Sequence, residues 1–190
     1  HYYYQDRKLK IKLNTKNVYS KGMFENVCLA IKVALDLNID KKVIQKALPF
    51  LSFEGRFQYL NKGKIKNKLN RNESIMIDGA HATADAQNLA SYLKKVKVTK
   101  YGIWAMTKNK DPDLFIKQLK GIFKKIVTMP IENEISSVST QELYKVATEN
   151  KFNVEKSDNF TQALKKISSK EKKLIVCFGS LYNCGNILNK

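Results

Sequence analysis

Short apolar runs alternate with segments of helical periodicity from residue 74 to the end of the chain, and this alternation constrains the fold most. The predicted strands are residues 74–77, 101–106, 125–129, a minor one at 154, and 174–178. The predicted helices are residues 83–93, 112–120, 140–149, 159–167 and 181–188. Strands and helices of these lengths that follow one another indicate parallel βαβ units. We therefore expect an α/β fold, a Rossmann-like and mostly parallel sheet with helices on both faces.

The first 54 residues follow a different pattern. Residues 8–16 alternate crudely, which predicts a short strand with Leu9, Ile11 and Leu13 on one side. Two helices are predicted next, at 23–37 and 41–48, with Asp40 as the N-cap of the second. These elements do not make a complete core, and residues 50–55 resemble a linker. We expect a domain boundary near residue 54, with domains at 1–54 and 55–190, and a new strand at 56–60.

The charge balance favours anionic partners. The net charge of the 190 residues is +18, almost all of it from lysines scattered among Asn and Ile. An AT-rich coding sequence would enrich the same three residue types, so the charge is weak evidence of function. A basic nucleic-acid-binding module stays open as an alternative. There is no apolar stretch of 18 residues, so we predict no membrane span. Three cysteines without a CxxC pair favour a reducing compartment, so we expect a cytoplasmic protein without a disulfide scaffold or zinc site.

The segment Asp78-Gly79-Ala80-His81 carries the most chemical information. It follows an apolar strand, and ligands of open α/β sheets bind beyond the carboxyl ends of the strands. An Asp at this place could accept hydrogen bonds from ribose hydroxyls, and His81 could donate to a phosphate or stack on a base. The plainer alternative is that Asp78 caps the next helix and His81 is an ordinary turn residue.

The same segment resembles the Asp-Gly-Ala-His segment of folylpolyglutamate synthases and dihydrofolate synthases in the Mur ligase superfamily. Four further segments are similar to the family in order and spacing: EGRFQYL, IWAMTKNKDPDLFIKQL, VTMPIENEISSVSTQELYKVA and VCFGSLYNCGNIL. The resemblance covers roughly residues 19–190. It implies the end of the central ATPase domain followed by a Mur ligase C-terminal domain.

The resemblance also implies roles for single residues. Asp78 would contact the ATP ribose, His81 would lie beside the nucleotide, and Arg56 would reach the phosphates. Lys110 and Ser180 would face the incoming L-glutamate. The alternatives are that Arg56 is a solvated linker charge, Lys110 one of many surface lysines, and Ser180 a helix N-cap.

This sequence departs from the family pattern in several places. Ala82-Thr83 replaces the usual Asn-Pro, Asn109 replaces an Asp, and Met23-Phe24-Glu25 follows Gly22 where the family has His-Gln. The glycine-rich triphosphate loop and the central-domain ligands for Mg²⁺ are not among these residues.

The implied reaction is the ATP-dependent addition of L-glutamate to dihydropteroate or folate through an acyl phosphate. Without the triphosphate loop, we expect this chain to be inactive alone. It would need an N-terminal half, on the same or a separate chain, or be the inactive remnant of a split ligase.

Overall fold

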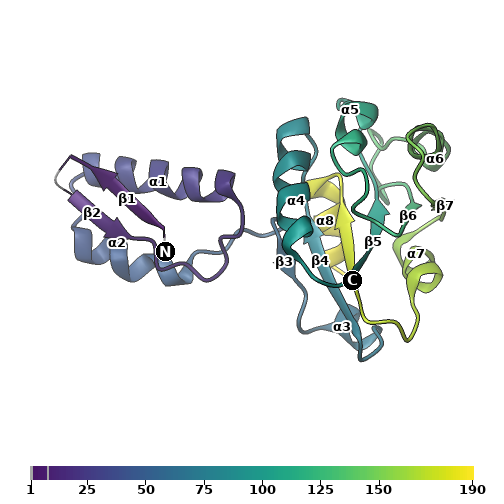
Figure 1. Ribbon diagram of the computed structural model, residues 1–190, viewed down its shortest axis with the longest axis horizontal. Coiled ribbons are helices and arrows are strands. Elements are labelled where there is room, and N and C mark those ends of the chain that lie inside the picture. The colour runs from purple at the N-terminus through teal and green to yellow at the C-terminus, as the bar shows by residue number, and fades with distance from the viewer. Residues whose placement is uncertain (1, 8) are drawn as a thin grey trace. The chain divides into compact units, whose positions relative to one another are not determined.

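The computed structural model describes residues 2–7 and 9–190, which separate into two compact units, His1–Glu54 and Gly55–Lys190 (Figure 1). We refer to them as unit 1 and unit 2.

Unit 1 is a β-hairpin with two helices. Strands β1 (Tyr3–Asp6) and β2 (Leu9–Lys12) pair antiparallel and are followed by α1 (Lys21–Asp36), α2 (Lys41–Ala47) and the 3₁₀ turn η1 (Leu48–Phe50). The side chains of Tyr4, Ile11, Val27 and Ile44 are buried. The predicted N-cap is confirmed, because the Asp40 carboxylate accepts from the backbone N–H of Lys42 at 2.7 Å.

The strand predicted at 8–16 was only partly right. Lys8 lies outside the described residues, and β2 ends at Lys12. The whole of β1 was missed, because the run of three tyrosines has no alternation of apolar and polar residues. Its pleat is nevertheless regular, since Tyr4 is buried while Tyr3 is exposed.

Unit 2 is the predicted α/β fold, with a six-stranded sheet in the order β3-β4-β8-β5-β6-β7. The strands are β3 (Gln58–Tyr59), β4 (Glu73–Asp78), β5 (Thr99–Trp104), β6 (Lys125–Thr128), β7 (Val154–Lys156) and β8 (Lys173–Phe178). The helices are α3 (Lys64–Asn67), α4 (Thr83–Lys95), α5 (Pro112–Lys117), α6 (Thr140–Glu149), α7 (Phe160–Ile167) and α8 (Leu181–Leu188). All neighbouring strands are parallel except β3, which runs antiparallel to β4. The last strand, β8, is central and buried along its whole length.

Helices cover both faces of this sheet (Figure 1). On one face, Ile77, Ile103 and Cys177 pack in a cluster with residues of α7 and α8. On the other face, Trp104 and Phe178 stack with Phe115 of α5, at centroid distances of 6.1 to 6.4 Å. The alternation of side chains along each strand therefore divides the core into two layers.

Most helix boundaries agree with the predictions because capping side chains fix them. Asp111 accepts from the N–H of Leu114, Ser139 from that of Glu142, and Asn159 from that of Gln162. Helix α5 ends at Lys117, three residues earlier than predicted. Hydrogen bonds of the 3₁₀ type, from each N–H to the carbonyl three residues before, continue to Lys120.

The strand predicted at 56–60 was too long. Only Gln58 and Tyr59 pair, and Phe57 before them has φ of +47°, outside the strand region.

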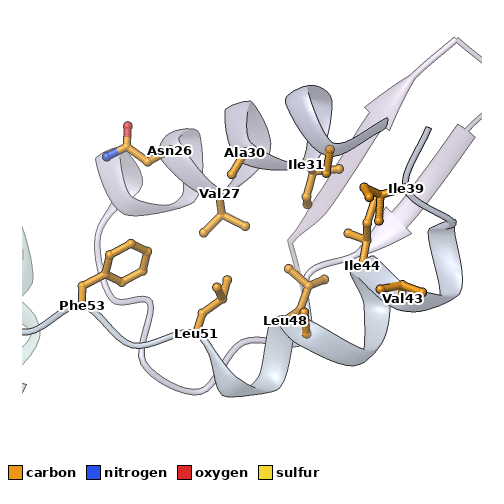
Figure 2. A pocket seen from close by; sticks show the side chains of 12 residues that line it. Asn26, Val27, Ala30, Ile31, Ile39, Val43, Ile44, Leu48, Leu51 and Phe53 are labelled. Carbon is orange, nitrogen blue, oxygen red and sulfur yellow. The ribbon is translucent and has the colours of Figure 1, made fainter. Parts of the chain in front are cut away.

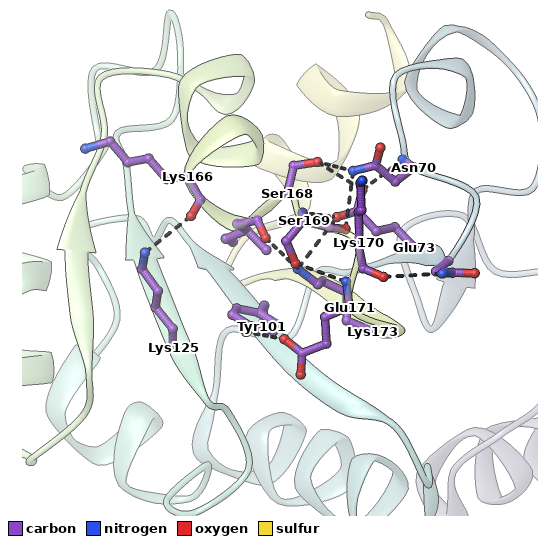
Figure 3. Close-up of polar contacts among 12 residues, drawn as sticks. Asn70, Glu73, Tyr101, Lys125, Lys166, Ser168, Ser169, Lys170, Glu171 and Lys173 are labelled. Atoms are coloured by element: carbon purple, nitrogen blue, oxygen red, sulfur yellow. Dashed lines mark hydrogen bonds and ion pairs between the residues drawn. The ribbon is translucent and has the colours of Figure 1, made fainter.

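A buried polar cluster lies at the amino ends of β4 and β8 (Figure 3). Glu73 and Lys173 form an ion pair at 3.7 Å, and both side chains are fully buried. The Glu73 carboxylate also accepts from the backbone N–H groups of Ser169 and Asn70 and from the Ser168 hydroxyl. It lies at the end of the sheet away from Asp78, which is the last residue of β4.

Across residues 2–7 and 9–190, no helix is both long and apolar enough to span a membrane.

Candidate nucleotide-binding site

Asp78 ends β4 at the carboxyl edge of the sheet, level with Phe178 of β8. Its side chain is 1% exposed, and its two oxygens accept from the backbone N–H groups of Phe57, at 2.9 Å, and Ala80, at 2.8 Å. Burial raises the pKa of Asp78 to about 6, although these two hydrogen bonds and the charge of Arg56 lower it. The Asp78 carboxylate therefore holds the backbone that carries Arg56 against the end of β4.

The structure does not support Asp78 as a helix cap. The N-cap of α4 is Ala82, which has no side-chain hydrogen bond to offer. The family's Asn-Pro at this point is replaced here by Ala82-Thr83.

Arg56 belongs to the first residues of unit 2, and two hydrogen bonds at the preceding Gly55 hold this part of the backbone in place. The Gly79 N–H donates to the Gly55 carbonyl at 2.6 Å, and the Gly55 N–H donates to the Gln58 side chain at 2.8 Å. The Arg56 guanidinium lies 4.0 Å from Asp78 and 3.6 Å from Asp85, and about 29% of the side chain is exposed. A partly exposed guanidinium on a fixed backbone is suited to a phosphate group.

His81 lies on the same edge with one ring nitrogen engaged. Its Nδ1 is 2.9 Å from the Gly79 carbonyl, so Nδ1 carries the hydrogen that forms this bond. The other nitrogen, Nε2, then accepts when the ring is neutral and donates to an anion only when the ring is protonated.

Asp85 is the site residue that sequence reasoning missed. Its carboxylate accepts from the backbone N–H of His81 at 3.4 Å, lies 4.0 Å from the His81 ring and pairs with Arg56. Two signals could have found it: its position four residues after His81, and its place in the first turn of α4, where an acid interacts favourably with the helix dipole.

Gly79 leaves room for a close approach of α8. A Cβ added there would lie 2.2 Å from the Leu181 side chain and 3.2 Å from its Cα, so a larger residue would force Leu181 to move. The absence of a side chain at Gly79 therefore lets the first turn of α8 lie close to the Asp78–His81 segment.

Lys110 and Ser180 also follow strands of the sheet, β5 and β8. Ser180 is buried and caps α8, accepting from the Tyr182 N–H at 3.1 Å, so the N-cap interpretation is confirmed. Lys110 is half-buried in the loop before α5. In the described part of the chain, no hydrogen bond or ion pair joins either residue to Arg56, Asp78 or His81.

The residues described do not provide a metal centre. No group of three or more His, Cys, Asp or Glu side chains within 2–7 and 9–190 is placed to hold a metal ion. We predicted that the Mg²⁺ ligands lie in polypeptide outside these residues, and this stays a prediction.

The fold is an α/β domain with a cluster of charged side chains at the carboxyl edge of its sheet, and comparison with known proteins gives the family. Residues 61–190 match the family model described as dihydrofolate synthetase, C-terminal domain. The chain belongs to this family. No curated protein matches the chain.

Solved structures show the same fold at low sequence identity. The Mycobacterium tuberculosis folylpolyglutamate synthase complexed with ADP and AMPPCP is 18% identical, with a TM-score of 0.76, over 90% of this chain and 40% of its own. Escherichia coli FolC in complex with DHPP and ADP is 16% identical, with a TM-score of 0.76, over 97% of this chain and 42% of its own. The Yersinia pestis bifunctional folylpolyglutamate synthase/dihydrofolate synthase complexed with AMPPNP and Mn is 15% identical, with a TM-score of 0.75 and shares of 97% and 42%. The chain thus spans about two fifths of the length of these structures.

Proposed function

We propose that this chain is the C-terminal part of an ATP-dependent ligase that adds L-glutamate to dihydropteroate or folate through an acyl phosphate. The family supports the ligase class, and several of the matching structures are complexes with ADP or with ATP analogues, one of them with Mn as well. The observation that carries the nucleotide role is the cluster of Arg56, Asp78, His81 and Asp85 at the carboxyl edge of the sheet.

In this proposal, unit 2 contributes positioning and charge rather than the phosphate loop. Arg56 reaches the phosphates, His81 lies beside the nucleotide, and Asp78 contacts the ribose through the lone pairs that its two backbone hydrogen bonds leave free. Lys110 and Ser180 at the neighbouring strand ends face L-glutamate. The nucleophile and the acyl phosphate must be aligned in contact, which domain closure over ATP provides. The phosphate loop and Mg²⁺ ligands belong to polypeptide outside these residues.

The role of Arg56 is tested by nucleotide binding, which does not require turnover. Replacing Arg56 with alanine is expected to weaken ATP binding to the 190-residue chain by about tenfold or more, because a charge-assisted hydrogen bond is worth about 1.5–3 kcal/mol. Fluorescence titration with a labelled ATP analogue measures the change. The matched control is Arg71→Ala, since Arg71 is an exposed arginine in the loop before β4. Equal losses in the two variants, or none in Arg56→Ala, would contradict the proposal.

Asp85 is expected to act against Arg56 in the same titration. Asp85→Asn removes a partly exposed carboxylate that pairs with Arg56 and repels phosphate, so ATP should bind more tightly by up to about fivefold, as expected for an ion pair worth about 0.2–1 kcal/mol. Unchanged or weaker binding would mean that Asp85 holds Arg56 in its productive orientation instead.

The nucleic-acid alternative predicts a different dependence. Binding to a DNA duplex would fall steeply with salt and would be lost evenly over many lysine variants, without a special effect of Arg56.

A further inference from the structure

The proposed reaction needs a group that accepts a proton. An α-amino group is mostly protonated at neutral pH, and an ammonium nitrogen has no lone pair with which to attack an acyl phosphate. A base must therefore take a proton from L-glutamate before the amide bond forms. The apolar groove between α1 and α2 in unit 1 cannot supply this base, because none of the described residues that line it carries a titratable side chain (Figure 2). The carboxyl edge of the sheet in unit 2 does carry titratable groups.

His81, at that edge, has the hydrogen pattern of a base. Its Nδ1 lies 2.9 Å from the carbonyl oxygen of Gly79, which can only accept, so Nδ1 carries the hydrogen. Nε2 of the neutral ring then has the lone pair. About 29% of the side chain is exposed, so a substrate can reach the ring. The Gly79 carbonyl thus fixes the tautomer in which Nε2 accepts a proton.

The charges around His81 compensate the charge that it would gain. The Asp85 carboxylate lies 4.0 Å from Nδ1 of His81 and pairs with Arg56 at 3.6 Å. The Asp78 carboxylate lies 4.0 Å from the same guanidinium. Two carboxylates therefore face one guanidinium, and a proton on His81 would make the cluster neutral.

His81 also lies near the residue that we propose faces L-glutamate. Ser180 caps α8, and Leu181 is the first residue of that helix. A Cβ added at Gly79, two residues before His81, would lie 2.2 Å from the Leu181 side chain. The segment that carries His81 is therefore in contact with the helix end that carries Ser180, and the contact between them is apolar. The two segments follow the carboxyl ends of neighbouring strands, β4 and β8, so an amine and an acyl phosphate can meet beside the ring.

We propose that His81 is the general base of the ligase and takes a proton from the ammonium group of L-glutamate through Nε2. This inference rests on the proposed function. The amine nitrogen then attacks the carbonyl carbon of the acyl phosphate. A C–N bond forms, and the C–O bond to phosphate breaks with its electron pair left on the phosphate oxygen. The nitrogen gives its second proton to the phosphate and keeps its third, while the protonated His81 releases its proton to water.

Two nucleophiles separate this role from nucleotide binding. The ligase is purified from the source cells through a tag on this chain, with and without His81→Gln, and supplied with ATP and dihydropteroate or folate. Hydroxylamine is largely unprotonated at neutral pH, so it traps the acyl phosphate as a hydroxamate without a base. His81→Gln should slow glutamate addition by about 10²-fold or more, the usual contribution of general base catalysis, and leave hydroxamate formation nearly unchanged. Ser91→Ala, an exposed residue of α4, is the control and should change neither rate.

The pH profile of glutamate addition gives a second readout. In the wild-type ligase the rate should level off with rising pH once the His81 ring is neutral. In His81→Gln the rate should keep rising into the alkaline range, because only L-glutamate that has already lost its proton to water can react.

Equal losses with glutamate and hydroxylamine would make His81 a nucleotide contact or a structural residue, and would overturn the proposal. Unchanged glutamate addition in His81→Gln would overturn it as well, while the proposed function would stand. The proposed function fails separately: if the purified ligase with His81 in place forms no product with either nucleophile, the reaction itself is wrong, and the role of His81 falls with it.

Discussion

Replacing Asp78 with asparagine is expected to remove a pH-dependent loss of stability from unit 2. Since burial raises the pKa of Asp78 to about 6, from an ordinary value of 3.8, the folded state binds more protons than the unfolded state between these two values. Stability therefore falls as pH rises from about 4 to 6 and stays lower above that range. A shift of about two units corresponds to roughly 3 kcal/mol at most.

The comparison across pH separates this effect from lost hydrogen bonds. Asparagine has one acceptor oxygen for the two N–H groups that Asp78 now satisfies, so the variant carries an offset that is the same at every pH. Urea unfolding at about pH 3.5 and about pH 7.5 should show the wild-type chain losing up to about 3 kcal/mol relative to Asp78→Asn. The control is Asp158→Asn, an exposed acid in the same unit. If the free energies of unfolding of wild type and Asp78→Asn differ by the same amount at both pH values, the charged Asp78 carboxylate does not destabilise the fold.

A carboxylate kept charged at the expense of stability is typical of functional sites, where activity and stability compete. If Asp78 contacts the ribose as proposed, the variant that escapes the pH-dependent loss should also bind ATP more weakly.

Most elements of unit 2 could be predicted because their signals are local, although the one-turn helix α3 was missed. Apolar runs, helical spacing and the capping residues Asp111, Ser139 and Asn159 each act within a few residues. The order of the strands depends on pairing between distant segments. Nothing near residues 173–178 indicates that the last strand lies between β4 and β5.

The position of the candidate site residues in the fold was predictable, but their contacts were not. The predicted strand before Asp78 and His81 placed them at its carboxyl end, where the structure has them. Their partners depend on the backbone at Phe57, which turns into the left-handed region and donates to Asp78 across 21 residues. The position of Arg56 beside Asp85 follows from that turn, and no periodicity encodes it.

Lys173 shows how composition can mislead. It stands in the run Ser168–Lys173, which contains three lysines and a glutamate and resembles a solvated loop. In the fold, its side chain is fully buried, its Nζ donates to the Ile167 carbonyl at 2.7 Å and lies 4.6 Å from the centre of the Tyr101 ring (Figure 3).

Replacing Lys173 with methionine is expected to destabilise unit 2 by about 3–5 kcal/mol. The substitution keeps most of the apolar length but leaves the Glu73 charge buried without its partner, and loss of one member of a buried pair costs this much. Burial raises the pKa of Glu73. The hydrogen bonds from Ser169, Asn70 and Ser168 and the charge of Lys173 lower it by more than that, so the pKa is lowered overall. The stability that Glu73 contributes is therefore present at neutral pH and is lost as pH falls.

Urea unfolding at about pH 7 measures the effect, with two comparisons that identify its cause. Lys124→Met removes the lysine of an exposed pair with Glu171, at 3.2 Å and 57% and 34% exposed, and should cost about 1 kcal/mol or less. The double variant Glu73→Gln with Lys173→Met removes both charges, so it should be less destabilised than the sum of the single variants by about 1–3 kcal/mol. If the double variant equals that sum, the two charges act independently, and the packing of the Lys173 chain rather than its ion pair would hold this end of the sheet together.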